Sequence, residues 1–197
     1  MKKTFMTLAA AAALMFAACG GSTTNNGAAA ESGDAATNKP AAAPVQKDDV
    51  PDVVTDGPIP LKKWQGDDFS ILYPADNITI DQSLSGPNSL SGGNDDMSLC
   101  INVSFCGWYK KSELNDMIEK AKGRVKDYYS SKPGTLTTEG EATVYRYEHD
   151  DKSSVSWHFI QFKDDTMSVE GDFSYPYAKK EEGEKVFKTI LNSIRWK

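Results

Sequence analysis

Apolar and polar residues alternate along several short stretches beyond residue 65, and this two-residue period is typical of β-strands with one buried face. The clearest case is 99–106, in which Leu99, Ile101 and Val103 alternate with cysteine and small polar residues. The same reasoning predicts further strands over 69–74, 78–82, 134–138, 142–149, 154–162 and 167–175. The stretch 83–96 holds three glycines and is predicted to be a mobile loop.

Two longer stretches follow the helical period, with apolar residues three or four positions apart on one side. The first covers 112–129, where Ser112 is placed to cap the helix, and the second covers 177–193. Their inward-facing residues are predicted to be Leu114, Met117, Ile118, Ala121, Val125 and Tyr128, and Val186, Phe187, Ile190, Leu191 and Ile194. Together these elements predict one α+β domain over 61–197, a mostly antiparallel sheet of about six to seven strands packed with two main helices.

The beginning of the chain follows a different pattern, in which two lysines precede an acid-free, largely apolar run over 5–16. This order is typical of a secretory signal peptide, here predicted over 1–18. The run is too short to cross a bilayer as a helix, which takes about 20 residues. The two alanines before Cys19 resemble the lipobox of bacterial lipoproteins, which implies cleavage after residue 18 and lipid on Cys19. Conventional cleavage that releases a soluble protein is the alternative.

The segment 19–60 is rich in Ala, Gly, Asn, Thr and Pro, and holds too little apolar surface to offset its ordering entropy. It is therefore predicted to be a disordered tether, with ends roughly 35 Å apart as a flexible coil. A partner-binding segment is the alternative. The acyl chains expected on Cys19 would hold the protein firmly to a membrane. In enterobacterial lipoproteins an Asp after the cysteine favours the inner membrane, so Gly20 implies the outer membrane of the bacterial envelope, with the domain facing the periplasm.

The net charge of the chain limits the classes of partner that it can bind. The formal net charge is −6, and removal of residues 1–18, which hold two lysines and no acidic residue, makes it −8. Such a charge argues against nucleic acid and against an additional electrostatic contact with anionic lipid.

The order of the predicted elements resembles that of a known family. A strand ending in Tyr73-Pro74 near the start of the domain, and a last helix running into Ser193-Ile194-Arg195-Trp196-Lys197, resemble the PsbP-like α/β/α sandwich family. The resemblance covers most of 65–197. It implies a binding or assembly module, since members serve mainly as accessory proteins of larger complexes. No ion site of the family carries over, because the chain has no matching ligand pattern.

The remaining cysteines and histidines do not form an obvious site. Cys100 and Cys106 lie six residues apart on one predicted strand, roughly 20 Å from each other, whereas a disulfide needs Cα atoms within about 7 Å. A bridge would require a sharp bend in that strand. Pairing Tyr145 with Trp157 across the predicted hairpin keeps the aromatic residues on one face, and it places His149 and His158 on opposite faces. A one-residue shift places the two histidines on the same face but still too far apart to share a metal.

Acidic doublets offer a second kind of candidate. Asp95 and Asp96 follow Asn94, and oxygen-rich loops of this type suit calcium, so these three residues are the candidate metal ligands. Turn formation is the alternative role, because Asp commonly starts turns. Aromatic residues of the later strands are predicted to form the core beneath the helices, with a ligand cavity as the alternative; they are Tyr145, Tyr147, Trp157, Phe159, Phe173 and Tyr175.

No nucleophile elbow, zinc-protease, phosphate-loop or dinucleotide motif occurs in the sequence. The leading hypothesis is therefore a non-enzymatic lipoprotein, without a cofactor, whose tethered domain binds another envelope protein or helps to assemble a complex. The alternative is a carrier of a small ligand or of calcium that uses 83–96 as a lid. An enzymatic function is a further alternative only if folding assembles a site that the sequence does not reveal.

Overall fold

The computed structural model describes residues 50–197, so the predicted signal peptide, Cys19 and the tether up to residue 49 lie outside the described residues. The described strands are β1 (Val53–Val54), β2 (Leu61–Gln65), β3 (Phe69–Tyr73), β4 (Thr79–Ile80), β5 (Ser89–Gly93), β6 (Cys100–Cys106), β7 (Thr135–Glu139), β8 (Ala142–Glu148), β9 (Ser154–Phe162), β10 (Ser168–Pro176) and β11 (Arg195–Trp196). The helices are α1 (Leu114–Tyr128) and α2 (Lys180–Leu191), each preceded by a 3₁₀ turn, η1 (Lys111–Glu113) and η2 (Tyr177–Lys179).

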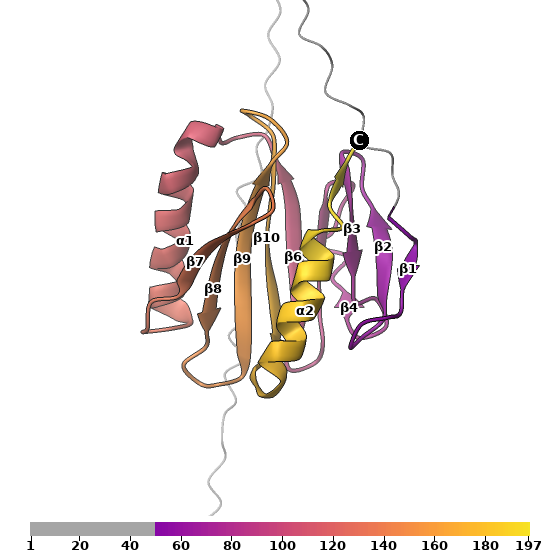
Figure 1. Cartoon of the computed structure of the whole chain (residues 1–197), viewed down its shortest axis with the longest axis vertical. Coiled ribbons are helices and arrows are strands. Elements are labelled where there is room, and N and C mark those ends of the chain that lie inside the picture. The colour runs from indigo at the N-terminus through magenta and orange to yellow at the C-terminus, as the bar shows by residue number, and fades with distance from the viewer. Residues whose placement is uncertain (1–49) are drawn as a thin grey trace, which may run out of the picture. The chain divides into compact units, whose positions relative to one another are not determined.

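The strands form two antiparallel sheets (Figure 1). The larger sheet has seven strands in the order β4-β5-β6-β10-β9-β8-β7, and the smaller has four in the order β1-β2-β3-β11. The α+β class with two helices is confirmed. Of the smaller sheet only β3 was predicted, because the other strands, of two to five residues, alternate weakly and leave little signal in a sequence.

The two helices cover opposite faces of the large sheet. Phe187 of α2 stacks on Trp157 of β9 at 5.3 Å between ring centroids. Val125 of α1 instead packs with Tyr145 and Tyr147 of β8. Tyr145 pairs with His158, whose side chain points away from that of its neighbour Trp157, so the two contacts lie on different faces. The smaller sheet shares the α2 face and contributes to the same core.

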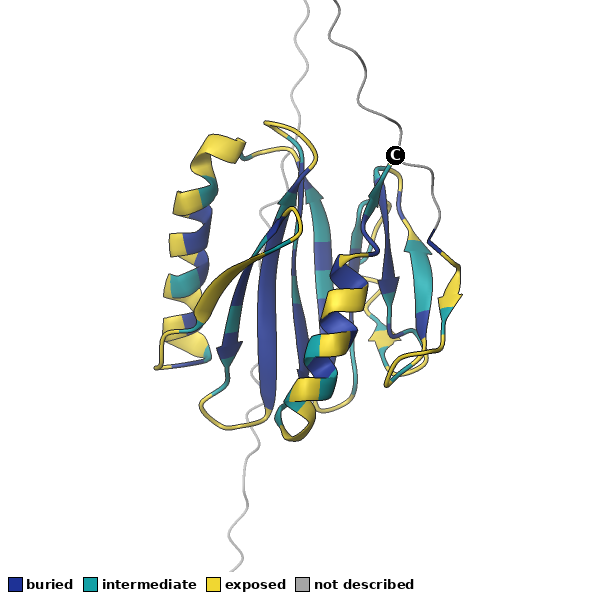
Figure 2. Ribbon diagram, viewed as in Figure 1, coloured by how far each residue is buried: buried dark blue, intermediate teal, exposed yellow. Residues whose placement is uncertain are grey.

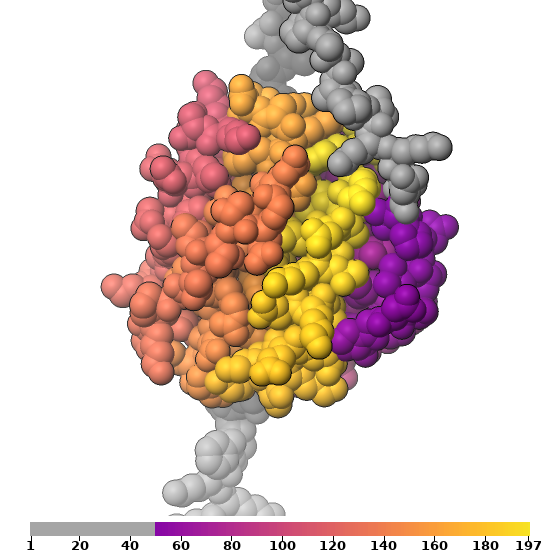
Figure 3. All heavy atoms as spheres, in the orientation of Figure 1, coloured from indigo at the N-terminus to yellow at the C-terminus, as the bar shows by residue number. Residues whose placement is uncertain are grey.

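This packing explains why apolar residues recur every three or four positions in the two helices. Met117, Ile118, Ala121 and Val125 are the buried residues of α1, four of the six inward positions predicted. Tyr128, also predicted to face inward, is exposed instead, and at this end of α1 the contact with Tyr145 and Tyr147 is made by Val125 and Tyr129. Figure 2 shows a buried stripe on each helix and an exposed outer side. Figure 3 shows the outer side of α2 between the β7–β8 hairpin and the β1–β2 region.

The register predicted for β8 and β9 is wrong by one residue. Tyr145 pairs with His158 and Tyr147 with Ser156, whereas Trp157 pairs with Arg146. The aromatic residues are therefore divided between two faces: Tyr145 and Tyr147 lie under α1, and the other four lie under α2. The prediction assumed a single buried face, but this sheet has an apolar layer on both sides.

The segment 83–96 is not a mobile loop, because it contains β5, which pairs with β6 along its whole length. Leu90 is buried on the α2 side, whereas the serines and glycines around it carry no hydrophobic signal. Gly92 has to be small at this place, since a Cβ there would lie 2.7 Å from the carbonyl oxygen of Thr79. The lid proposed for the carrier alternative is therefore part of the sheet.

The fold also begins before residue 61, within the segment assigned to the tether. β1 pairs with β2, and Val50 is buried in the main core. The isolated valines of this segment carry no periodic signal, so only their packing shows that they belong to the domain.

Candidate functional site

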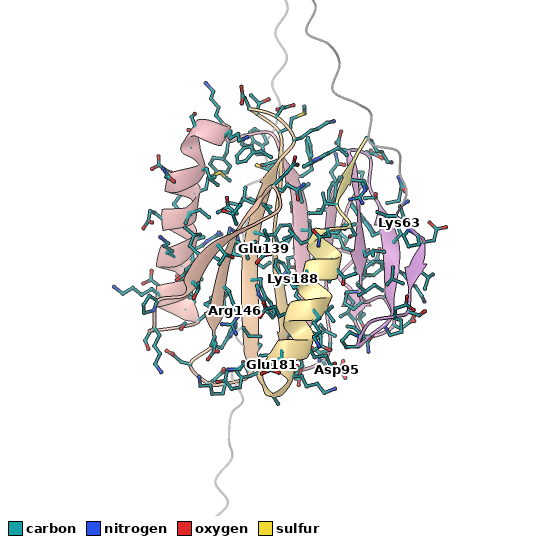
Figure 4. The ribbon with its side chains drawn as sticks, in the orientation of Figure 1. Lys63, Asp95, Glu139, Arg146, Glu181 and Lys188 are labelled. Atoms are coloured by element: carbon teal, nitrogen blue, oxygen red, sulfur yellow. The ribbon has the colours of Figure 1, made fainter. Side chains whose placement is uncertain are left out.

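The candidate calcium residues lie in the turn between β5 and β6. The side-chain oxygen of Asn94 accepts the amide N–H of Leu99 at 3.0 Å, and Asp96 accepts that of Ser98 at 2.9 Å. Hydrogen bonding from the hydroxyl of Ser98, and then from its backbone amide, lowers the pKa of Asp96. Asp95 is exposed beside them (Figure 4). The structure therefore uses Asn94 and Asp96 as turn-forming residues.

These residues also line an open depression of about 440 Å³ together with Asp76. The carboxylate of Asp76 is paired with the ammonium of Lys62. Within residues 50–197 no group of three or more His, Cys, Asp or Glu side chains is arranged to hold a metal ion. The depression thus brings Asp76, Asp95 and Asp96 together without arranging them as the ligands of one metal ion.

The two histidines lie on the α1 side of the sheet, in separate hydrogen-bonded pairs. His158 Nδ1 is 3.0 Å from Asp172 Oδ1 of β10. His149 Nε2 is 2.9 Å from Ser156 Oγ, and its ring stacks on Tyr147 with centroids 5.4 Å apart. They share a face, contrary to the predicted register, but each has its own partner. They do not form a joint site.

Burial and charge act on these two histidines differently. Desolvation lowers the pKa of His149. Desolvation also opposes protonation of His158, but the charge and hydrogen bond of Asp172 outweigh it, with a contribution from Glu170, and raise the pKa of His158 above its ordinary value of 6.5. The protonated imidazolium of His158 therefore stabilises the folded state, whereas that of His149 does not.

This difference predicts opposite pH dependences for two variants. Because the folded-state pKa of His158 is raised, its contribution is complete below pH 6.5 and is lost as pH rises through the folded value. The difference in unfolding free energy between wild type and His158→Gln should therefore shrink from pH 5.5 to pH 9, measured by urea denaturation. For His149→Gln it should grow as pH rises through 6.5, because the folded pKa is lowered. A pH-independent difference for His158→Gln would contradict the imidazolium–carboxylate pair.

Cys100 and Cys106 are free thiols at the two ends of β6. Both are buried, and burial raises the pKa of each thiol. A thiol held in its protonated form is a poor nucleophile and a poor metal ligand. These buried cysteines are therefore packing residues of β6.

The most exposed large apolar side chains of the described chain lie at the two ends of α1. Trp108, in the loop between β6 and η1, is 71 % exposed, and Tyr128, in the last turn of α1, is 78 % exposed. Exposure of a tryptophan indole to this extent leaves a large apolar surface in water.

The loop that carries Trp108 is held on both sides. Tyr109, its neighbour, packs on the apolar cluster of Met117, Ile118, Ile160 and Phe162. The amide of Lys111 donates to the carbonyl oxygen of Asp165 at 2.8 Å, which ties the loop to the β9–β10 turn. The amide of Lys110 donates to Glu113 Oε2 at 2.8 Å.

We call residues 107–111 the Trp108 loop. Its backbone is positioned by the sheet, the helix and a neighbouring turn, while the indole remains outside. The ammonium of Lys120 lies 5.6 Å from the centre of the Tyr109 ring, and Lys110 and Lys111 are exposed. An exposed aromatic side chain on an ordered support is a feature of protein-binding hot spots.

Sequence reasoning missed Trp108. A tryptophan and a tyrosine stand next to each other after β6, and neighbouring side chains of an extended segment point in opposite directions. The only available signal was Gly107 before the pair and two lysines after it, which is typical of a surface loop. Which ring faces inward is decided by the apolar cluster between α1 and β9, on which Tyr109 packs.

The comparisons with known proteins show a similarity of fold and no match in sequence family. No protein-family model matches the chain, and a search of curated proteins finds no match. Among solved structures, the solution structure of PsbP (CyanoP) from the cyanobacterium Synechocystis sp. PCC 6803 matches with a TM-score of 0.50 and 12 % identity, covering 70 % of this chain and 92 % of that one. The fold of this chain therefore resembles that of PsbP.

A crystal structure from Bacteroides thetaiotaomicron VPI-5482 also matches, with a TM-score of 0.41 and 16 % identity. The alignment covers 68 % of this chain and 49 % of that one, so the present chain corresponds to about half of its length. No helix within residues 50–197 has the length and apolar character needed to cross a membrane.

Proposed function

We propose that this chain is a non-enzymatic lipoprotein of the bacterial envelope whose domain binds another envelope protein through the Trp108 loop. The observation that carries the proposal is the 71 % exposure of Trp108 on a loop that is otherwise fixed to the domain. Because the loop backbone is already ordered, little conformational entropy is lost when a partner covers the indole. Burial of an indole then contributes directly to affinity.

Site-specific photocross-linking tests the contact in cells. A photoreactive benzoylphenylalanine placed at position 108 should give a cross-linked partner, identified by mass spectrometry. The same group at position 128 is the matched control, because Tyr128 is equally exposed at the other end of α1. A partner recovered equally from both positions, or from neither, would remove the Trp108 loop from the proposal.

With the partner in hand, the Trp108→Ala variant should bind it at least about 30-fold more weakly. Truncation of a hot-spot tryptophan costs about 2 kcal/mol or more, and each 1.4 kcal/mol corresponds to a factor of about 10 in affinity. The measurement is calorimetric or interferometric titration of the full chain. Tyr128→Ala is the control and should bind like wild type, with both variants checked for unchanged melting.

Membrane anchoring is the second part of the proposal and rests on the lipobox-like sequence before Cys19. Replacing Cys19 with alanine should move the protein out of the membrane fraction or leave it unprocessed, as seen by fractionation and by gel mobility. Cys106→Ala, which removes a buried thiol from the domain, should stay in the membrane fraction. Normal processing and anchoring of Cys19→Ala would refute lipidation at this residue.

A further inference from the structure

The outermost strand at one end of the large sheet is β7, and it is open to solvent. At the opposite end of the sheet the edge is β4, which has two residues, whereas β7 has five. Its first four residues are exposed, and Leu136 among them is 48 % exposed. The strand contains no lysine and no proline, which are devices that block pairing at natural sheet edges. β7 is therefore suited to receive another strand.

The hairpin geometry determines which backbone groups of β7 face outward. β7 and β8 are joined by Gly140 and Glu141, and Glu139 pairs with Ala142 across this two-residue turn. Gly140 has a φ of +60°, as the first central position of such a turn requires. A two-residue turn closes on a hydrogen-bonded pair, and hydrogen-bonded pairs then alternate along the strand. Thr135, Thr137 and Glu139 therefore bond to β8, while the N–H and C=O groups of Leu136 and Thr138 face outward.

This arrangement is complementary to itself, and we propose that two copies of the chain pair through β7, antiparallel, about a two-fold axis at Thr137. In this register Leu136 of one copy exchanges backbone hydrogen bonds with Thr138 of the other. Glu139, the only charged residue of β7, lies opposite Thr135, so no like charges face each other. The interface is isologous and closed, as expected of a homodimer. This inference does not depend on the Trp108 loop.

The side chains on the α1 side also favour a second copy. Leu136 pairs with Tyr145, and both lie on the face covered by α1. Across the proposed axis the two copies of Leu136 are diagonal neighbours, within reach of each other at about 7–8 Å. Half of this leucine is in water in the single chain, so pairing adds apolar burial to the backbone hydrogen bonds.

The side chain of Glu139, at the end of β7, is engaged on the face of the sheet opposite to Leu136. Glu139 lies beside Lys188 of α2, with 4.0 Å between the carboxylate oxygen and the ammonium nitrogen (Figure 4). This contact is on the α2 face, the opposite face to that of Leu136. The second copy can therefore approach the edge without displacing α2.

A cysteine at the two-fold axis gives the sharpest test. Opposite residues that do not exchange hydrogen bonds have Cα atoms about 4.5 Å apart, which is within the range of a disulfide. Thr137→Cys in the full chain, purified in detergent and treated with a mild oxidant, should therefore run mainly as a dimer on a non-reducing gel. Thr135→Cys is the matched control on the same strand and face, because its two copies would lie roughly 14 Å apart. The native Cys100 and Cys106 are buried, and unsubstituted chain provides the background.

A second variant tests the same interface without relying on one disulfide. Leu136→Lys, made in the Thr137→Cys chain, places a charge at the centre of the contact and should reduce dimer formation about tenfold. Leu84→Lys is the control, since Leu84 has the same 48 % exposure in a different part of the surface.

Each outcome decides between the alternatives. No dimer with Thr137→Cys, equal dimer with Thr135→Cys, or no effect of Leu136→Lys would overturn the proposal. Trp108→Ala should leave the dimer unchanged while it weakens binding of the envelope partner, so failure of partner binding and failure of β7 pairing are separate results.

Discussion

Replacing Phe187 with alanine is expected to lower the free energy of unfolding by about 3–5 kcal/mol, a large part of the stability of a domain of this size. Phe187 is 1 % exposed. Its ring stacks on Trp157 and Phe173, with centroids 5.3 and 6.1 Å away, and contacts Phe159 at 6.0 Å. Three rings on rigid central strands cannot collapse into the space that the side chain leaves, so the cavity adds to the lost burial.

Urea denaturation of Phe187→Ala checks this expectation. Lys185→Ala on the same helix is the control, because Lys185 is exposed and alanine is at least as good a helix former. It should change stability by less than about 0.5 kcal/mol. A loss below about 2 kcal/mol for Phe187→Ala would mean that α2 is held mainly by other contacts.

The second prediction compares the same substitution, glycine to alanine, in the two helices. In the interior of a helix this change usually stabilises by about 1 kcal/mol. At Gly123 of α1 a new Cβ meets no atom within 4 Å, so Gly123→Ala should give this gain. At Gly183 of α2 a new Cβ would lie 2.6 Å from both Cβ and Cγ of Tyr175. Cβ is bonded to the backbone of β10 and cannot move without it, and Cγ is bonded to that Cβ.

For Gly183→Ala we therefore expect overpacking of about 3 kcal/mol to exceed the helical gain of about 1 kcal/mol, a net loss of about 2 kcal/mol. Displacing the Tyr175 ring would also disturb its hydroxyl, which donates to Glu182 Oε1 at 2.7 Å. Chemical denaturation of the two single variants measures both changes in the free energy of unfolding, a gain for Gly123→Ala and a loss for Gly183→Ala. Stabilisation by both substitutions would show that α2 can shift away from the sheet at low cost.

The long elements of the fold were predictable because each carries its own period. β9 has the predicted bounds, 154–162, and β6 begins one residue after the predicted position. The apolar face of β6 consists of Ile101, Val103 and Phe105, and it needs only alternation to be recognised. The helices were found for the same reason, although Ser112 lies in η1 and does not cap α1.

Several shorter strands were not predictable, because they form only through pairing with a neighbouring strand. β5 consists of serine, leucine and glycine, and it is a strand because β6 lies beside it. The register of β8 on β9 was wrong because the prediction placed all the aromatic residues on one buried face, whereas both faces of this sheet carry an apolar layer. Neither the assignment of β5 nor the register of β8 on β9 can be decided from one segment of the sequence alone.

The candidate site shows the same division. The acidic turn at Asn94–Asp96 was identified from the sequence, yet its hydrogen bonds to Ser98 and Leu99 show a turn-forming role that composition alone did not separate from cation binding. Trp108 was not identified, because an aromatic residue next to a strand is most often part of the core.

The sequence by itself determined the α+β class, the two helices, the long central strands and the expectation of lipid on Cys19, because each of these depends on a local period or a contiguous segment. Only the tertiary structure decided which of Trp108 and Tyr109 faces water, which histidine is paired with Asp172, and that β7 is left as the open edge of the sheet. These features depend on contacts between residues far apart in the chain, and burial, strand register and sheet edges exist only once those contacts have formed.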